Sequence, residues 1–275
     1  MKVSIFSMIN MMVTIVVIFG LPFVFFWIFR KKTGIFRAMA AGSMAFFVAQ
    51  YVVRIPIMNR VLVLEPFAFV FDSPILYAVI LAVTAAFFEL VFRILVLRYF
   101  IPDIQKKHHI LAVGFGHGMI EAILLVGLSY VNNLIVSFLI NSNRVSEIVS
   151  ESTDATLVDQ MVDTLVNTSS WVFLVGGLER VLMIGIHMAI TILAFKGLKN
   201  TTLRLKYWGA AFLIHFVLDF SVVVFQLANF PVFLIEFVIV GFALLAWTII
   251  KKYWNEPEVI IKKDAKLFRE IEDNA

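Results

Sequence analysis

Ionisable side chains stand inside several strongly apolar segments of this chain. They are of the types used in acid–base and metal chemistry, and they fall on four consecutive segments: Glu89 and Arg93; His117 and Glu121; Glu179, Arg180 and His187; His215 and Asp219. A charged side chain at the centre of a lipid-embedded helix costs about 2.5 to 3.5 kcal/mol on insertion scales, so each one needs a partner or a purpose. The concentration of such groups indicates a functional site.

The spacing of these residues places them on common helix faces. Three pairs are each separated by four residues and therefore share a face: Glu89 with Arg93, His117 with Glu121, and His215 with Asp219. Glu89 and the three histidines also lie roughly 7 to 10 residues, or ~10 to 15 Å, from the predicted cytoplasmic end of their segments. Groups at one depth can meet, so we expect a single site in the cytoplasmic half of a helical bundle.

The elements that position these residues are transmembrane helices. The chain has 275 residues, of which 61% are hydrophobic and 15% charged, too apolar for a soluble core. Seven apolar runs are long enough to span a membrane: 4–29, 36–53, 75–98, 110–130, 171–195, 206–228 and 232–250. We predict an all-α polytopic bundle over residues 1–252, with a catalytic core at about 75–228 and a charged cytoplasmic tail at 253–275.

Charge in the loops predicts the orientation. Lysine and arginine concentrate in the first, third and fifth loops and after the last run, whereas the fourth loop is acidic and the sixth uncharged. We therefore expect a multi-pass protein of the plasma membrane with the N-terminus outside and the C-terminus in the cytoplasm. The net charge of +4 is spread over helix ends, so no nucleic-acid partner is expected.

Outside the seven apolar runs, two further segments have helical patterns. Apolar residues recur at helix-like spacing in the loop at 141–170 and in the tail at 256–275, which predicts an amphipathic helix in each. The fourth run continues past the paired Asn132 and Asn133, where the helix either projects from the bilayer or breaks. His108 and His109 stand beside lysines and are expected to be solvated loop residues.

At these residues the chain resembles the CAAX-protease and bacteriocin-processing (CPBP) superfamily of intramembrane proteases, most closely its YhfC-like branch, over roughly residues 75–228. The superfamily motifs are EExxxR, FxxxH and HxxxN or HxxxD. Their counterparts here are Phe88, Glu89 and Arg93 for the first, Val113 and His117 for the second, and His215 and Asp219 for the third. Phe88 replaces the first glutamate, and Val113 replaces the phenylalanine.

The resemblance implies hydrolysis of peptide bonds in or beside the membrane of a bacterium. His117 with either Glu89 or Glu121 would activate water, and Glu121 is the candidate to replace the missing glutamate. His215, held by Asp219, would polarise the scissile carbonyl or hold the oxyanion. The expected substrate is a peptide or a membrane protein, and membrane lipid is the expected surrounding partner.

The remaining polar residues receive supporting roles. His187 would share water activation or oxyanion binding, Arg93 would pair with Glu89, and Glu179 and Arg180 would support the helices. The sequence favours a mechanism without a cofactor, because the zinc-binding motif HExxH does not occur. The alternative is Zn²⁺ bound by His117, His187 and His215 with a carboxylate. The absence of cysteine excludes thiolate catalysis and thiolate metal ligands.

Other interpretations of the same residues remain open at the level of sequence. Buried carboxylates and histidines also couple proton or cation movement in transporters, although no inverted repeat joins the two halves of the chain. An inactive scaffold of the same fold is the third class. Gly114, Gly116 and Gly118 suit either close helix packing or room for a substrate beside His117.

Overall fold

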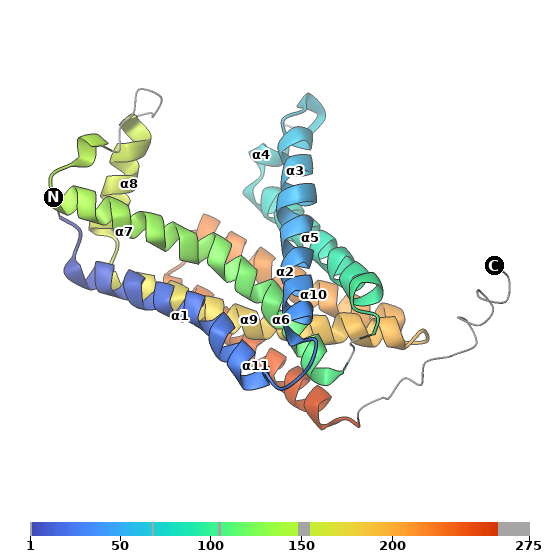
Figure 1. The fold of residues 1–275 in the computed structure, drawn as a ribbon. Coiled ribbons are helices and arrows are strands. Elements are labelled where there is room, and N and C mark those ends of the chain that lie inside the picture. Colours follow the sequence, from blue (N-terminus) through green and yellow to red (C-terminus); the bar gives the residue numbers. More distant parts are fainter. Residues whose placement is uncertain (1, 68, 104–105, 148–154, 258–275) are drawn as a thin grey trace, which may run out of the picture.

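The computed structural model describes residues 2–67, 69–103, 106–147 and 155–257. Every regular element in these ranges is helical (Figure 1). In chain order they are α1 (Ile5–Phe29), α2 (Ile35–Phe47), η1 (Val48–Arg54), α3 (Ile55–Val61), η2 (Glu65–Phe67), α4 (Phe69–Asp72), α5 (Pro74–Leu95), η3 (Val96–Phe100), α6 (Lys107–Ala122), η4 (Ile123–Gly127), α7 (Leu128–Asn141), η5 (Val145–Glu147), α8 (Ala155–Asn167), α9 (Ser170–Lys199), α10 (Arg204–Leu227) and α11 (Val232–Asn255).

Seven helices are long and apolar enough to cross a membrane, which confirms the predicted all-α bundle. Two of them are longer than the sequence suggests: the second runs over Ile35–Val61 and the fourth over Lys107–Asn141. Both are built from consecutive helical segments, as α2–η1–α3 and α6–η4–α7. In Figure 1 the α2–α3 rod and α5 rise at an angle to α1 and α7, which lie side by side.

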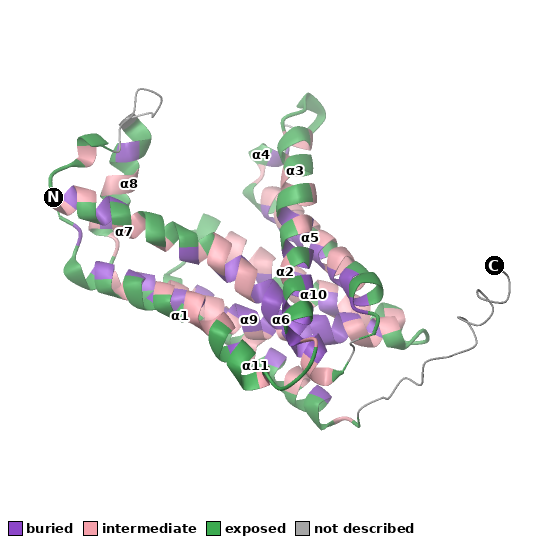
Figure 2. Cartoon of the chain, viewed as in Figure 1, coloured by how far each residue is buried: buried purple, intermediate pink, exposed green. Residues whose placement is uncertain are grey.

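The centre of the bundle is α6, held at backbone contact between α2 and α9. A Cβ atom on Gly116 would overlap the Met39 carbonyl of α2, and one on Gly42 would overlap the Val113 carbonyl of α6. On the other side of α6, a Cβ on Gly118 would lie 2.8 Å from the Ile184 Cα of α9. The glycines near His117 are therefore close-packing positions. Buried residues concentrate where these three helices meet (Figure 2).

We predict that Gly116→Ala destabilises the protein by about 1–3 kcal/mol, because the new methyl group must push two helix backbones apart. Gly185→Ala on α9 is the matched control, since a Cβ there meets nothing within 4 Å. Thermal unfolding in detergent measures both variants. Equal melting temperatures for the two would contradict the close packing of α2 on α6.

Three spans contain π-helical segments next to the polar residues of the core. η1 includes Gln50 and Arg54, η3 begins three residues after Arg93, and η4 begins two residues after Glu121. π-Helical turns are frequent at functional sites. The fourth span does not break at Asn132 and Asn133. It departs from α-helical geometry in η4, and the α-helix then continues through the two asparagines to Asn141.

The short helix α8 confirms the amphipathic helix predicted in the fourth loop. Its Met161, Val162 and Leu165 pack into an apolar cluster with residues of α1 and α7, including Met11 and Val136. The helix predicted in the tail at 256–275 falls almost entirely outside the described residues. The expectation of solvated loop residues at His108 and His109 was wrong: both belong to the start of α6, where His108 is half-buried and the side chain of His109 is buried.

His109 is held by hydrogen bonds on both ring nitrogens. The backbone N–H of Lys106 donates to Nδ1 at 3.3 Å, and Nε2 lies 2.8 Å from the carbonyl oxygen of Thr33. One bond caps α6 and the other ties it to the first loop. The bond to Thr33 joins residues that are 76 positions apart, so the residues next to His109 in the sequence do not predict it.

Candidate active site

Glu89 of α5 is the residue on which most of the polar side chains converge. Its carboxylate is buried, with Oε1 accepting a hydrogen bond from Gln50 Nε2 at 2.6 Å and Oε2 lying 2.9 Å from His117 Nε2. Arg93 Nη2 is 3.8 Å from Oε2, and His215 Nε2 is 3.6 Å away. Glu89 thus joins four helices: α5, the α2–η1 span, α6 and α10.

Glu121 of α6 forms a second centre beside the first. Arg180 Nη1 donates to its Oε1 at 3.1 Å, and Arg180 also pairs with Glu179. His187 Nε2 lies 2.6 Å from the other oxygen, Oε2, but neither atom has a partner in hydrogen-bond geometry. The predicted supporting pair Glu179 and Arg180 is therefore in contact with the core of the site.

Two residues orient the histidines. Arg93 is completely buried and its Nη2 lies 3.1 Å from His187 Nδ1. Because a guanidinium can only donate, a neutral His187 carries its proton on Nε2, the nitrogen that faces Glu121. On α10, Asp219 Oδ2 lies 3.3 Å from His215 Nε2, so the predicted His–Asp pair is formed.

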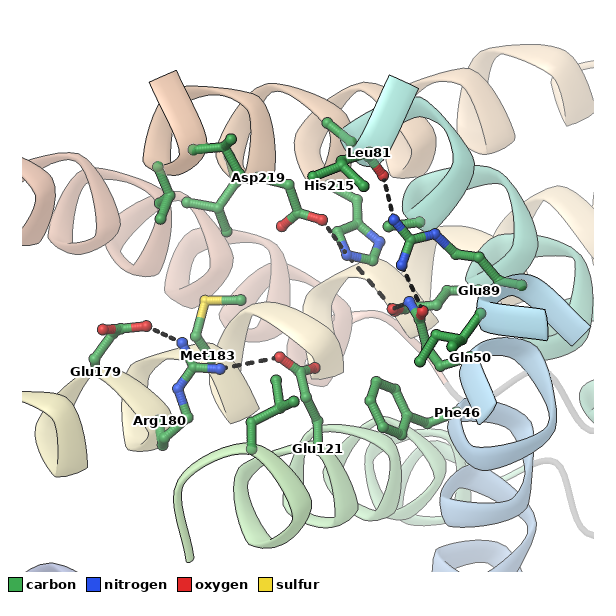
Figure 3. Close-up of a pocket in the computed structure, with 18 of the residues that line it drawn as sticks. Phe46, Gln50, Leu81, Glu89, Glu121, Glu179, Arg180, Met183, His215 and Asp219 are labelled. Atoms are coloured by element: carbon green, nitrogen blue, oxygen red, sulfur yellow. Dashed lines mark hydrogen bonds and ion pairs between the residues drawn. The ribbon is translucent and has the colours of Figure 1, made fainter. Parts of the chain in front are cut away.

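A cavity of about 380 Å³ opens onto these groups. Figure 3 shows Glu89 and Gln50, His215 and Asp219, and Glu121 with Arg180 and Glu179 approaching it from three sides. His117 and His187 do not line it; they lie behind Glu89 and Glu121. Carboxylates therefore face the cavity, and two imidazoles support them from within the bundle.

The cavity extends towards one end of the spans. Beyond the polar cluster it is lined by Arg54, Leu81, Glu179 and Val223, which lie towards the ends that border the acidic and uncharged loops. On the opposite side, buried apolar residues such as Ala112 fill the space between the cluster and the lysine-rich loops. The cluster itself stands near mid-span, so the cavity approaches it from the side opposite to the predicted cytoplasmic face.

The direction of access can be measured because the chain contains no cysteine. We expect a membrane-impermeant maleimide added to intact cells to label Val223→Cys and not Ala112→Cys. Lys251→Cys, in the segment predicted to be cytoplasmic, is the control for sealed cells. Labelling of Val223→Cys only in inverted vesicles would reverse the predicted orientation, and labelling of Ala112→Cys alone would contradict the direction of the cavity.

The donor atoms fit a metal ion. One ligand atom from each of Glu89, His117, Glu121 and His187 lies within 4.8 Å of the others. Three buried atoms of this group lack a hydrogen-bond partner in the described structure: His117 Nδ1, Glu121 Oε2 and His187 Nε2. Two of the three, Glu121 Oε2 and His187 Nε2, face each other at 2.6 Å, so a cation would chiefly give a partner to His117 Nδ1 and to the lone pairs of the two carboxylates. The set differs from the predicted one, since Glu89 and Glu121 join His117 and His187, and His215 lies outside it.

Six predicted catalytic residues are thus brought together, and two residues of the site were missed. Gln50 binds Glu89, and Arg54 donates to Gln50 Oε1 at 2.9 Å. They are four residues apart on the second span, the same spacing that identified the other pairs. Arg54 fell one residue beyond the predicted end of that span, and Gln50 carries no charge.

The fold and the site define a class: a seven-span helical membrane protein with a buried carboxylate and imidazole cluster beneath a cavity. Residues 15–240 match the family described as YhfC intramembrane metalloprotease, and the chain belongs to this family. It is 27% identical over 205 residues to the "Uncharacterized membrane protein YhfC" of Bacillus subtilis (strain 168), covering 73% of this chain and 77% of that protein. No solved structure matches it.

The family match confirms the YhfC part of the resemblance seen in the sequence. It also agrees with the prediction of a membrane-embedded protease, because the family's description names that activity. Placement in the wider CPBP superfamily stays a prediction.

Proposed function

We propose that this protein is an intramembrane peptidase that hydrolyses peptide bonds in the cavity above Glu89, Glu121 and His215. The observation that carries the proposal is the convergence of Glu89, His117, Glu121 and His187 within 4.8 Å, in an otherwise apolar bundle. Such an arrangement provides bases for water in a place with restricted solvent. The family description supports the same reaction class.

The carboxylates that face the cavity would remove a proton from the attacking water. Glu89 is held from two sides by Gln50 and His117, so its orientation is fixed before substrate arrives. Glu121 is fixed by Arg180 and belongs to the same group of ligand atoms. It would supply the second carboxylate, because the first glutamate of the EExxxR motif is Phe88 in this chain. In a metal-free site one of the two would accept the proton from water and deliver it to the leaving amine; if both also hold a metal ion, a carboxylate oxygen that does not bind the metal would have this role.

His215 would stabilise the oxyanion. Its Nε2 is turned towards Asp219 and Glu89, and its buried Nδ1 has no hydrogen-bond partner in the described residues. A protonated Nδ1 would therefore have a free donor for the carbonyl oxygen of a substrate in the cavity. Asp219 would keep the ring in this orientation.

We propose that a divalent metal ion, with Zn²⁺ as the first candidate, is held by Glu89, His117 and Glu121. His187 is the poorest ligand, since its contact with Arg93 leaves Nε2 protonated and suited to donate to Glu121. Three protein ligands with an open position for water match catalytic zinc sites. When bound, the metal would lower the pKa of water and polarise the scissile carbonyl. The donor set thus favours the metal-dependent alternative over the metal-free preference drawn from sequence.

Metal content of the purified protein tests this assignment without an activity assay. We expect about one divalent ion per chain and a loss of affinity of more than about 100-fold in Glu121→Gln, since even outer-shell partners of a metal typically contribute 10- to 100-fold. Glu65→Gln, an exposed glutamate on η2 outside the cavity lining, should keep the wild-type content. Full activity after removal of all metal would restore the glutamic mechanism.

Peptide hydrolysis by the protein in lipid vesicles tests the proposed reaction itself. A library of apolar peptides should yield cleaved products with wild-type protein and none with His117→Ala. Transport of protons or cations without cleavage would favour the transporter class. Absence of both would favour the inactive scaffold.

A further inference from the structure

Arg54 is the third arginine of the core, and it differs from the other two in its partners. At the end of η1, it donates from Nε to Thr84 Oγ1 at 3.0 Å, from Nη1 to Gln50 Oε1 at 2.9 Å, and from Nη2 to the Leu81 carbonyl at 2.8 Å. All three acceptors are neutral. These bonds fix the guanidinium at the cavity wall and leave two of its five N–H groups without an acceptor among the residues that the structure describes.

Within the described residues, Arg54 has no carboxylate in ion-pair contact. The two other core arginines do: Arg93 lies 3.8 Å from Glu89, and Arg180 lies 3.1 Å from Glu121. The carboxylates of Glu89 and Asp219 act on Arg54 only at longer range, and an intramembrane cation that no anion contacts commonly marks a substrate or ion pathway. The half-buried guanidinium of Arg54 is therefore a candidate binding group for an anion that enters the cavity.

The rest of the cavity lining discourages anions from binding elsewhere. Its ionisable groups besides Arg54 include four carboxylates, those of Glu89, Glu121, Glu179 and Asp219. The nearby guanidinium of Arg180 already contacts two of them. A negatively charged part of a substrate would be repelled by the carboxylates of the cavity and attracted by Arg54. The charge would therefore also determine the orientation in which the substrate binds.

The distance from Arg54 to the reacting groups is short. Gln50 alone separates them, since it accepts from Arg54 and donates to Glu89 at 2.6 Å. An anion on Arg54 would consequently lie about one side chain away from Glu89. For a peptide this distance places the charged group within one or two residues of the bond that is cleaved.

We propose that Arg54 binds a carboxylate of the substrate, so that the enzyme selects peptides with a free C-terminus or an acidic side chain close to the scissile bond. This inference rests on the proposed peptidase function and names its substrate class. A guanidinium pairs with a carboxylate through two parallel hydrogen bonds, which fits the two unused N–H groups. Arg54 is thus a specificity-determining residue of the cavity wall.

Binding of a matched peptide pair tests this assignment separately from catalysis. The probes are one fluorescent apolar peptide with a free C-terminal carboxylate, its C-terminal amide, and the amide with a single aspartate near its end. Their affinities are measured by anisotropy on the Glu89→Gln variant in vesicles. We expect the carboxylate peptide to bind about 10- to 100-fold more tightly than the amide, the range for a charged hydrogen bond.

Adding Arg54→Gln should remove this preference by weakening only the charged peptides, whereas Arg60→Gln on the exposed surface of α3 should preserve it. Recovery of tight binding by the aspartate-containing amide would identify an acidic side chain as a sufficient source of the carboxylate. Equal affinities of acid and amide, or a preference that survives Arg54→Gln, would overturn the inference. An equal loss for all peptides would also overturn it, because it would mean that Arg54 merely holds Gln50 and Glu89.

The outcome for the peptidase function is read independently. Wild-type protein that binds the carboxylate peptide preferentially but cleaves no peptide would support Arg54 as an anion-binding residue and contradict the proposed hydrolysis. Cleavage of the acid and amide peptides at equal rates would support the proposed hydrolysis and contradict the role of Arg54.

Discussion

Replacing Glu89 by glutamine is expected to lower kcat for peptide hydrolysis by about 10²–10⁴-fold, the usual contribution of a general base. Glutamine preserves the volume and can still accept a hydrogen bond from Gln50, but it cannot take a proton from water. Initial rates of cleavage of a fluorogenic peptide in vesicles measure the effect. Unchanged melting temperature would show that the loss is chemical.

The matched control is Glu65→Gln, which removes an exposed glutamate of η2 outside the cavity lining. Its rate should equal that of the wild type. Glu121→Gln, assayed with divalent metal in excess so that a lower metal affinity does not limit the rate, decides between the two candidate bases: if it retains more activity than Glu89→Gln, Glu89 is the base. Near wild-type rates in both variants would remove the two carboxylates from the mechanism.

The second large effect is expected on stability. Arg93→Met should destabilise the protein by about 3–5 kcal/mol, because it leaves a buried carboxylate without its cation. Arg93 is 0% exposed and contacts Glu89 and His187. The variant should unfold at a lower temperature in detergent, and Arg93→Lys should recover part of the loss.

Arg98→Met is the control for loss of an arginine from the same span, since that side chain is exposed at its end. It should change the melting temperature little. If Arg93→Met and Arg98→Met had equal melting temperatures, the charge of Glu89 would have to be balanced mainly by its histidine neighbours.

The sequence was sufficient to predict the spans and most of the site, for a common physical reason. Burial in lipid makes every charged residue costly, so Glu89, Glu121 and His215 stand out against their apolar neighbours. Their shared depth then predicts that they meet, which the structure confirms for the cluster around Glu89.

The features that the sequence did not predict depend on contacts between distant segments. Gln50 is uncharged, and its importance follows only from its hydrogen bond to Glu89, 39 residues away. The change in candidate metal ligands has the same origin, because contact between α5 and α6 brings Glu121 within 4.8 Å of Glu89, and this contact joins different helices. Spacing within one helix gives the face of a residue and leaves its partners on other helices undetermined.

The π-helical segments have a consequence for how the family varies in length. Each such turn holds one residue more than an α-helical turn, so η1, η3 and η4 are places where a chain can lose one residue and relax to regular α-helix. The downstream part of the span would keep its orientation. Single-residue gaps between homologous chains, otherwise rare inside a span, should therefore gather at these three segments, and chains with a gap in η1 would present a different wall to the substrate.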